Sequence, residues 1–98
     1  MGLNGANFSG AFFSLADLHL AFIPDTNLTG AFLIGADLTS ATLQGSDLTG
    51  AHLLDTDFTD ADLTDVKWPS NTPPPRGRER DPDSGLLHQA SAGASSGP

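Results

Sequence analysis

The sequence contains no cysteine, so neither a disulfide framework nor a thiolate metal site can be built from it. It has only four lysine and arginine residues against twelve aspartate and glutamate residues. Residues 1–70 hold nine aspartates and one lysine, which gives this part a net charge of −8. Because affinity for nucleic-acid phosphates comes largely from lysine and arginine, we expect no direct nucleic acid binding. An acidic body suits solubility, cations or a basic partner.

Long hydrophobic runs are also missing. No stretch approaches the roughly 20 apolar residues that a membrane-spanning helix needs. The first ten residues, MGLNGANFSG, contain neither the basic region nor the apolar region of a secretory signal peptide. We therefore expect a cytoplasmic protein without membrane contact, and the lack of cysteine fits a reducing compartment.

A five-residue period runs through residues 1–70. The third position of every unit is apolar, and the first position is small in nearly every unit. A fixed period of this kind is a strong structural signal and indicates a repeat architecture. The third positions are Leu3, Phe8, Phe13, Leu18, Ile23, Leu28, Leu33, Leu38, Leu43, Leu48, Leu53, Phe58, Leu63 and Trp68.

The period of five predicts a solenoid. It fits neither the 3.6-residue period of an α-helix nor the two-residue alternation of a simple strand. The first and third positions of a unit lie two residues apart, so on an extended segment they share one face. The other residues must turn the chain through a corner, and glycine is frequent at the fifth position, where a tight turn favours it. Each unit therefore places one small and one large side chain in the interior.

The units ADLTS, SDLTG, TDFTD and ADLTD between residues 36 and 65 resemble the A-[DN]-[LF]-x-x motif of the pentapeptide repeat family. The resemblance implies an all-β fold, a right-handed quadrilateral β-helix with one repeat on each side and four repeats in each coil. Fourteen units at four per coil would make about 3.5 coils in residues 1–70. Residues twenty positions apart would then stack on one another.

The composition divides the chain into two regions. Residues 1–70 are predicted to form the pentapeptide-repeat β-helix, and residues 71–98 a disordered tail rich in proline, glycine and serine. Docking of Leu86 and Leu87, the only apolar pair of the tail, on the end of the solenoid is the alternative to a solvated tail. Met1 falls in a repeat with no preceding cap, so we expect either a partner on that end or a longer protein of which this chain is a piece.

Stacking at twenty residues brings apolar side chains together on one outer side. Second positions form a column of Phe12, Phe32 and His52, and fourth positions beside it include Ile34 and Leu54. Contiguous apolar patches tend to mark interfaces. We therefore predict a contact face made of Phe12, Phe32, Ile34 and Leu54, which binds a protein partner or a second copy of the chain. Cover by the chain's own tail, or by further residues of a longer protein, is the alternative.

Another outer side carries an acidic ladder of Asp17, Asp37 and Asp57, with rungs roughly 5 Å apart. One interpretation is a solvated repeat consensus, in which each aspartate caps backbone amides near its turn. The other is a row of charges that imitates the phosphates of DNA, because some pentapeptide repeat proteins resemble duplex DNA and inhibit topoisomerases.

Catalytic and cofactor-binding motifs are not found in the sequence. The serine and threonine residues follow the repeat frame, and no nucleophile, base and orienting residue can be assembled from them. His19, His52 and His88 are far apart in that frame and have no cysteine partner, so we expect no zinc site. The glycines recur every five residues rather than in a phosphate-binding loop or a calcium-binding nonapeptide repeat. We expect no enzyme, no metal, no cofactor and no small-molecule substrate.

The sequence therefore predicts a non-enzymatic solenoid that acts as a protein–protein interaction or structural module. The alternative is a DNA-mimicking inhibitor or protector of a type II topoisomerase, which would use the acidic ladder. A structural fragment without independent activity is the third possibility.

Overall fold

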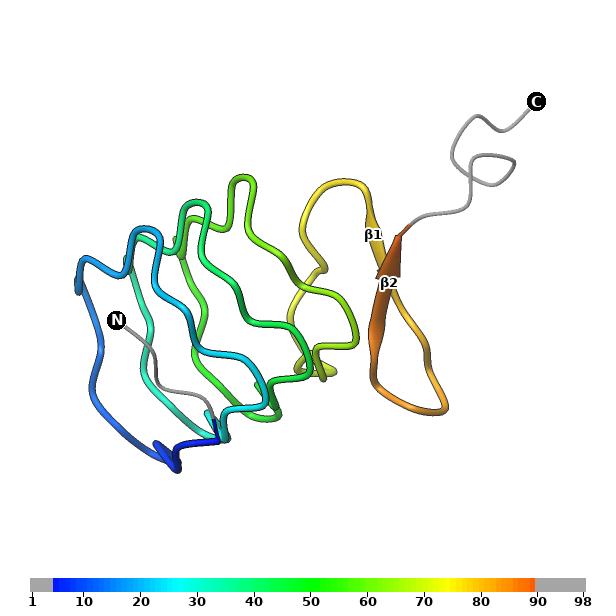
Figure 1. The fold of residues 1–98 in the computed structure, drawn as a ribbon. Coiled ribbons are helices and arrows are strands. Elements are labelled where there is room, and N and C mark those ends of the chain that lie inside the picture. The colour runs from blue at the N-terminus through cyan, green and yellow to red at the C-terminus, as the bar shows by residue number, and fades with distance from the viewer. Residues whose placement is uncertain (1–4, 90–98) are drawn as a thin grey trace.

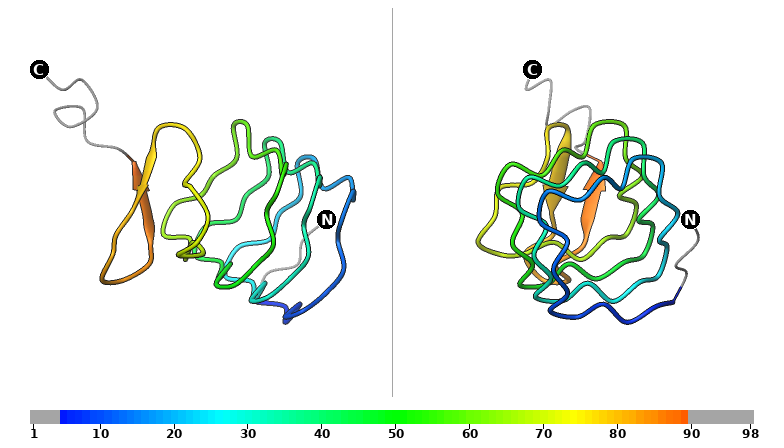
Figure 2. Two further views of the ribbon diagram at one scale, coloured as in Figure 1. Left: turned by 180° about the vertical axis from the view of Figure 1, so that it is seen from behind. Right: turned by 90° about the vertical axis from the view of Figure 1, so that its left-hand side faces the viewer.

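Residues 5–67 wind into stacked coils in the computed structural model, which describes residues 5–89 (Figure 1). Each five-residue unit contributes one residue to a parallel β-bridge and then turns. The bridges join residues twenty positions apart, such as Asn7 with Asn27, Asn27 with Asp47, and Asp47 with Lys67. Twenty residues are four units, so each coil has four sides, and the view along the axis shows the coils in superposition (Figure 2). The predicted stacking is confirmed.

Backbone hydrogen bonds run from coil to coil. The Leu38 N–H donates to the Asp57 carbonyl at 2.8 Å, and the Asp37 N–H donates to the Ala16 carbonyl at 2.9 Å. A side in the middle of the solenoid is therefore paired with the coil before it and the coil after it, which satisfies its backbone groups without an open edge. The extended strands of the described residues, β1 (Arg78–Arg80) and β2 (Leu87–Gln89), lie outside the coils.

First and third positions of the repeats fill the interior. The third-position side chains of the middle coils are almost completely inaccessible to solvent, and small side chains lie beside them. The regular alternation of a small and a large side chain lets four sides meet around one narrow, close-packed core. The buried third positions include Leu28, Leu33, Leu38, Leu43, Leu48 and Leu63.

The corners of the coils require a left-handed backbone. From Gly5 to Asp65, the fifth residue of every unit has a φ between 53° and 76°. Glycine adopts this conformation without steric cost, whereas Leu15 and Leu20 adopt it against the preference of residues with a β-carbon. Glycine and aspartate at most of the other fifth positions are thus explained by the turn, because they tolerate this region better than most residues.

A buried hydroxyl group supports one of these turns. Ser46 replaces alanine at a first position, and its hydroxyl donates to the Ile23 carbonyl at 2.6 Å. The same hydroxyl accepts a hydrogen bond from the Thr26 N–H at 3.0 Å. It therefore links the two ends of the turn that contains Pro24. Within residues 5–89, every buried side-chain nitrogen and oxygen has a hydrogen-bond partner.

The interior is less well covered at the N-terminal end of the described coils. Phe8, Phe13 and Leu18 are only half-buried, although they occupy third positions. The rings of Phe8 and Phe13 pack edge to face, with their centroids 5.4 Å apart and an interplanar angle of 78°. The first described coil has a described neighbour on one side only, so these side chains keep part of their surface exposed.

A β-hairpin covers the C-terminal end. β1 and β2 pair antiparallel, with Arg80 opposite Leu87. Leu87 is 1% exposed, and its N–H donates to the Val66 carbonyl at 2.7 Å. Lys67 and Leu86 form an antiparallel bridge that joins the hairpin to the last coil. The hairpin, drawn in yellow to orange, lies beside the end of the solenoid (Figure 1).

The prediction of a disordered tail over residues 71–98 is therefore wrong for residues 71–89. Docking of Leu87, which was the alternative, is what the structure shows. The edge of the last coil offers N–H and carbonyl groups, and pairing with that edge satisfies them while it buries an apolar side chain. The prolines at 73–75 lie in the connection before β1, outside the strands. The rest of the predicted tail, 90–98, lies outside the described residues.

Candidate interaction surface

Three aromatic rings stack along one outer side of the solenoid. Phe12 and Phe32 are bridged in the backbone, as are Phe32 and His52. The ring centroids of Phe12 and Phe32 are 5.0 Å apart with an interplanar angle of 21°. Those of Phe32 and His52 are 4.3 Å apart with an angle of 8°. The spacing of paired strands, about 4.8 Å, suits such stacking, so the predicted column forms a continuous ring stack.

Ile34 and Leu54 lie beside this stack. Both side chains are exposed, Leu54 to 69%. Together with His52 they line a shallow pocket of about 250 Å³. Because His52 also stacks on Phe32, it connects the ring stack to the two aliphatic side chains. The structure thus brings the predicted contact face together on one side of the solenoid.

The C-terminal segment reaches only one end of the contact face. Asn71 and Thr72 line the same shallow pocket as Ile34 and Leu54. At the other end Phe12 remains 84% exposed. Cover by residues 71–89, one of the alternatives from the sequence, therefore does not extend over the face as a whole.

Leu15 extends the contact face and was missed by the sequence-based prediction. Its N–H donates to the Ile34 carbonyl at 2.9 Å. Its Cδ2 lies over Gly35, only 2.8 Å from the place where a β-carbon would be. The side chain is itself exposed. The signal in the sequence was an apolar residue at a fifth position, where the other units mostly have glycine, aspartate or serine.

The acidic ladder is present, and its carboxylates form local hydrogen bonds. Asp17, Asp37 and Asp57 are bridged in line. Oδ1 of Asp37 accepts the Thr39 N–H at 3.0 Å and the Thr39 hydroxyl at 2.7 Å. Asp57 accepts the same two groups of Thr59 at 3.0 Å and 2.6 Å. Asp37 and Asp57 therefore make the local hydrogen bonds that the first of the two interpretations expects.

Capping also lowers the pKa values of Asp37 and Asp57. The Thr39 hydroxyl, followed by its N–H, lowers the pKa of Asp37 below the ordinary value of 3.8, because both groups favour the charged carboxylate. Thr59 lowers the pKa of Asp57, and Thr64 lowers that of Asp62, in the same way. Repulsion from Asp37 raises the pKa of Asp57 but is its smallest contribution. Hydrogen bonding within a repeat therefore outweighs repulsion between rungs.

The lowered pKa values predict that the fold loses stability in acid. A carboxyl group whose pKa is lower in the folded than in the unfolded state stabilises the fold above the unfolded value, here 3.8. This stabilisation is lost as the pH falls through the folded values. We expect a melting temperature that is nearly constant between pH 7 and pH 5 and decreases below about pH 4, measured by circular dichroism.

Asparagine provides the matched control for this prediction. Asn27 already caps Thr29 with its Oδ1, at 3.0 Å from the N–H and 2.8 Å from the hydroxyl. The triple variant Asp37→Asn, Asp57→Asn, Asp62→Asn should keep the caps but show a smaller decrease in acid. An equally large decrease in the triple variant would show that these three carboxylates do not cause it.

Residues 5–89 contain neither a candidate metal site nor a membrane-spanning helix. No group of three histidine, aspartate or glutamate side chains is placed there to hold a metal ion. No helix in the same residues is long and apolar enough to cross a membrane. His19 contacts the next coil instead, with Nδ1 2.8 Å from the Thr39 hydroxyl.

The repeat frame, the stacking at twenty residues and the capped turns agree with a comparison of the sequence with known families. Pentapeptide repeats match in eight copies, over residues 3–33, 25–53 and 36–67. The chain belongs to the pentapeptide repeat family. Members of this family are generally non-enzymatic structural repeat proteins, and their fold is of the β-helix type.

Two solved structures are similar to this pentapeptide repeat chain. A pentapeptide repeat protein from the thylakoid lumen of Arabidopsis thaliana shares 37% sequence identity, with a TM-score of 0.65 over 66% of this chain and 45% of that chain. Rfr23, a pentapeptide repeat protein from the cyanobacterium Cyanothece 51142, shares 30% identity, with a TM-score of 0.35 over 62% of this chain and 55% of that chain. The chain thus spans about half the length of each. A search among curated proteins gave no match.

Proposed function

We propose that this pentapeptide repeat solenoid is a non-enzymatic interaction module that associates with a second copy of itself through the contact face. The observation that carries the proposal is the ring stack of Phe12, Phe32 and His52, which ends in a ring that is 84% exposed. Ile34 and Leu54 widen it into a continuous apolar surface. Association removes this surface from water, which is favourable in proportion to the apolar area buried.

A second copy is the partner that the face suits best. Closed dimers with a two-fold axis are the commonest oligomers, and they need one self-complementary patch. Flat rings on the side of a solenoid can meet an identical set across such an axis. Since both copies carry a net charge of −8, they repel each other, and salt screens this repulsion. Self-association should therefore strengthen as the ionic strength increases, whereas binding to a basic partner would weaken.

The mass in solution tests the proposal. We expect the wild-type chain, at 10.1 kDa, to show a larger mass by light scattering that increases with protein concentration and with salt. The double variant Phe12→Ser, Phe32→Ser should have the monomer mass under all of these conditions. Phe22→Ser is the matched control, because Phe22 is exposed but belongs to a different column, bridged to Thr42. A monomeric wild-type chain, or a double variant with unchanged mass, would overturn the proposal.

The handedness of the solenoid and its number of coils are also part of this proposal. We infer the right-handed winding and the roughly 3.5 coils from the family resemblance and from the fourteen units of the sequence. The bridges at twenty residues support four repeats per coil.

A DNA-mimicking inhibitor of a type II topoisomerase is the second candidate function. The in-line arrangement of Asp17, Asp37 and Asp57 supports it. We place it second because capping of the turns accounts for the same carboxylates without a partner.

A further inference from the structure

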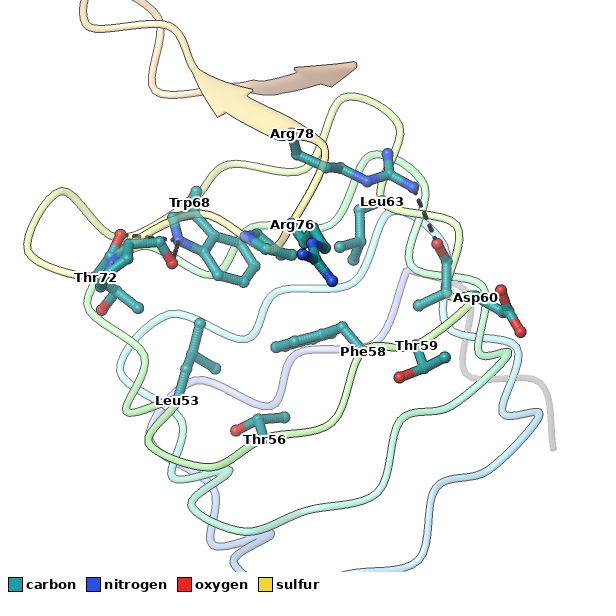
Figure 3. Close-up of a pocket in the computed structure, with 13 residues that line it drawn as sticks. Leu53, Thr56, Phe58, Thr59, Asp60, Leu63, Trp68, Thr72, Arg76 and Arg78 are labelled. Carbon is teal, nitrogen blue, oxygen red and sulfur yellow. Dashed lines mark hydrogen bonds between the residues drawn. The ribbon is translucent and has the colours of Figure 1, made fainter. Parts of the chain in front are cut away.

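A pocket of about 650 Å³ lies between the last coil and the segment that leads to the hairpin (Figure 3). Its inner wall is apolar and includes Leu53, Phe58, Leu63 and Trp68. The rings of Phe58 and Trp68 meet with their centroids 5.3 Å apart at an angle of 64°. These residues occupy third positions of the repeats, so the pocket continues the core of the solenoid.

The opposite wall carries positive charge. The four lysine and arginine side chains of the chain all lie between residues 67 and 80, and Arg76 and Arg78 line the pocket. Arg78 donates from Nη2 to the Ala61 carbonyl at 3.2 Å, which positions its guanidinium at the rim. For Arg76 the structure records no hydrogen-bond or ion-pair partner within residues 5–89. Figure 3 shows the Arg76 side chain turned into the pocket, near the ring of Trp68.

Other donors in the lining are already in use. The Thr56 hydroxyl donates to the Leu33 carbonyl at 2.6 Å, and the Thr59 hydroxyl donates to Asp57 at 2.6 Å. The Trp68 Nε1–H donates to the carbonyls of residues 72 and 73 at 3.1 Å and 3.3 Å. The N–H groups that remain for a ligand are therefore mainly those of the two guanidinium groups.

We propose that this pocket binds a small organic monocarboxylate with an aromatic body. The carboxylate would accept hydrogen bonds from Arg76, whose planar fork of N–H groups matches its two oxygens. The ring would pack mainly against Phe58, which is partly buried, and would meet only the small accessible part of Trp68. Asp60 is the only carboxylate in the lining, so the two arginines leave the pocket with a net positive charge in an otherwise acidic chain. Volume, apolar walls and a few convergent polar groups are typical of sites for small ligands.

This binding site was not predicted from the sequence, and it is independent of the contact face. No small-molecule substrate was expected, because the sequence contains no catalytic or cofactor-binding motif. The segment that forms the charged wall was predicted to be disordered, so the pocket itself could not be foreseen. None of Phe12, Phe32, Ile34 and Leu54 lines the pocket. Success or failure of the ligand experiment therefore has no bearing on the experiment on self-association.

Trp68 is the single tryptophan of the chain and reports on the site directly. We expect titration of the full chain with phenylacetate to produce a saturable change in Trp68 fluorescence, with a Kd on the order of 1 mM or below for a ligand of this size. The Trp68 indole N–H signal in a nitrogen-15 NMR spectrum should shift over the same concentration range. No saturable change up to about ten times that concentration would overturn the proposal.

Matched ligands and variants separate the contribution of the carboxylate to binding from that of the aromatic ring. Phenylacetamide, which keeps the ring but has no charge, and Arg76→Gln should each weaken binding by about tenfold or more, the usual effect of losing a charged hydrogen bond. Lys67→Gln, which removes a cation outside the pocket, should leave binding unchanged. Equal affinity for phenylacetate and phenylacetamide, or an Arg76→Gln variant that binds like the wild type, would contradict the assignment of the carboxylate to Arg76.

Discussion

Replacement of Leu38 by alanine is expected to lower the free energy of unfolding by about 2–5 kcal/mol. Leu38 is 0% exposed and lies in the middle of an interior column, between Leu18 and Phe58 in the register of twenty. The backbone on both sides of it is fixed by hydrogen bonds to neighbouring coils, so the walls cannot collapse around a smaller side chain. A small domain has a total stability of only about 5–15 kcal/mol, so the loss is a large share of it.

Two leucines of the same chain are matched controls for Leu38→Ala. Leu20 is 63% exposed and lies outside the contact face, and Leu20→Ala should change the free energy of unfolding by less than about 0.5 kcal/mol. Leu18 belongs to the same column as Leu38 but is half-buried at the end, so Leu18→Ala should have an intermediate effect. Urea unfolding followed by circular dichroism measures all three. Equal losses for Leu38→Ala and Leu20→Ala would contradict the arrangement of the interior.

The interior could be predicted from the sequence because every repeat places a small and a large apolar side chain at the same two positions. A large side chain at Leu38 and a small one at Ala36 recur in each unit, and a period of twenty follows once four sides close a coil. The contact face could be placed by the same register. The stacking of the Phe32 and His52 rings could not be predicted, because the rotation of a side chain depends on its neighbours in space.

The hairpin could not be predicted because its stability does not come from its own composition. Residues 71–89 are rich in proline, glycine and charge, which is typical of disordered segments. What holds them is a pairing across space, in which the Trp68 N–H donates to the Gly85 carbonyl and the Arg80 Nε to the Trp68 carbonyl, both at 2.8 Å. The last coil has an edge of unpaired N–H and carbonyl groups, with which the hairpin pairs. The position of this edge follows from the complete solenoid and cannot be read from the composition of residues 71–89.

Replacement of Leu87 by aspartate is expected to release the hairpin from the solenoid. Leu87 is 1% exposed, so the variant loses a buried leucine and places an unpaired carboxylate against the core. We expect the docked state to lose more than about 3 kcal/mol relative to the released state. Trp68, which is 3% exposed beneath the hairpin, should then meet water and shift its fluorescence emission to longer wavelength.

Trypsin measures this release through its cleavage sites at Arg78 and Arg80, which lie in β1 of the docked hairpin. When opening is fast, cleavage follows the population of the open state, so a loss of about 3 kcal/mol should accelerate it by more than about a hundredfold. Gln89→Asp adds the same charge at an exposed position of β2 and should be cleaved at the wild-type rate. If Leu87→Asp stays folded and is cleaved no faster than Gln89→Asp, then Leu87 does not hold the hairpin on the solenoid. If both variants are cleaved rapidly, the effect comes from the added charge and not from the buried leucine.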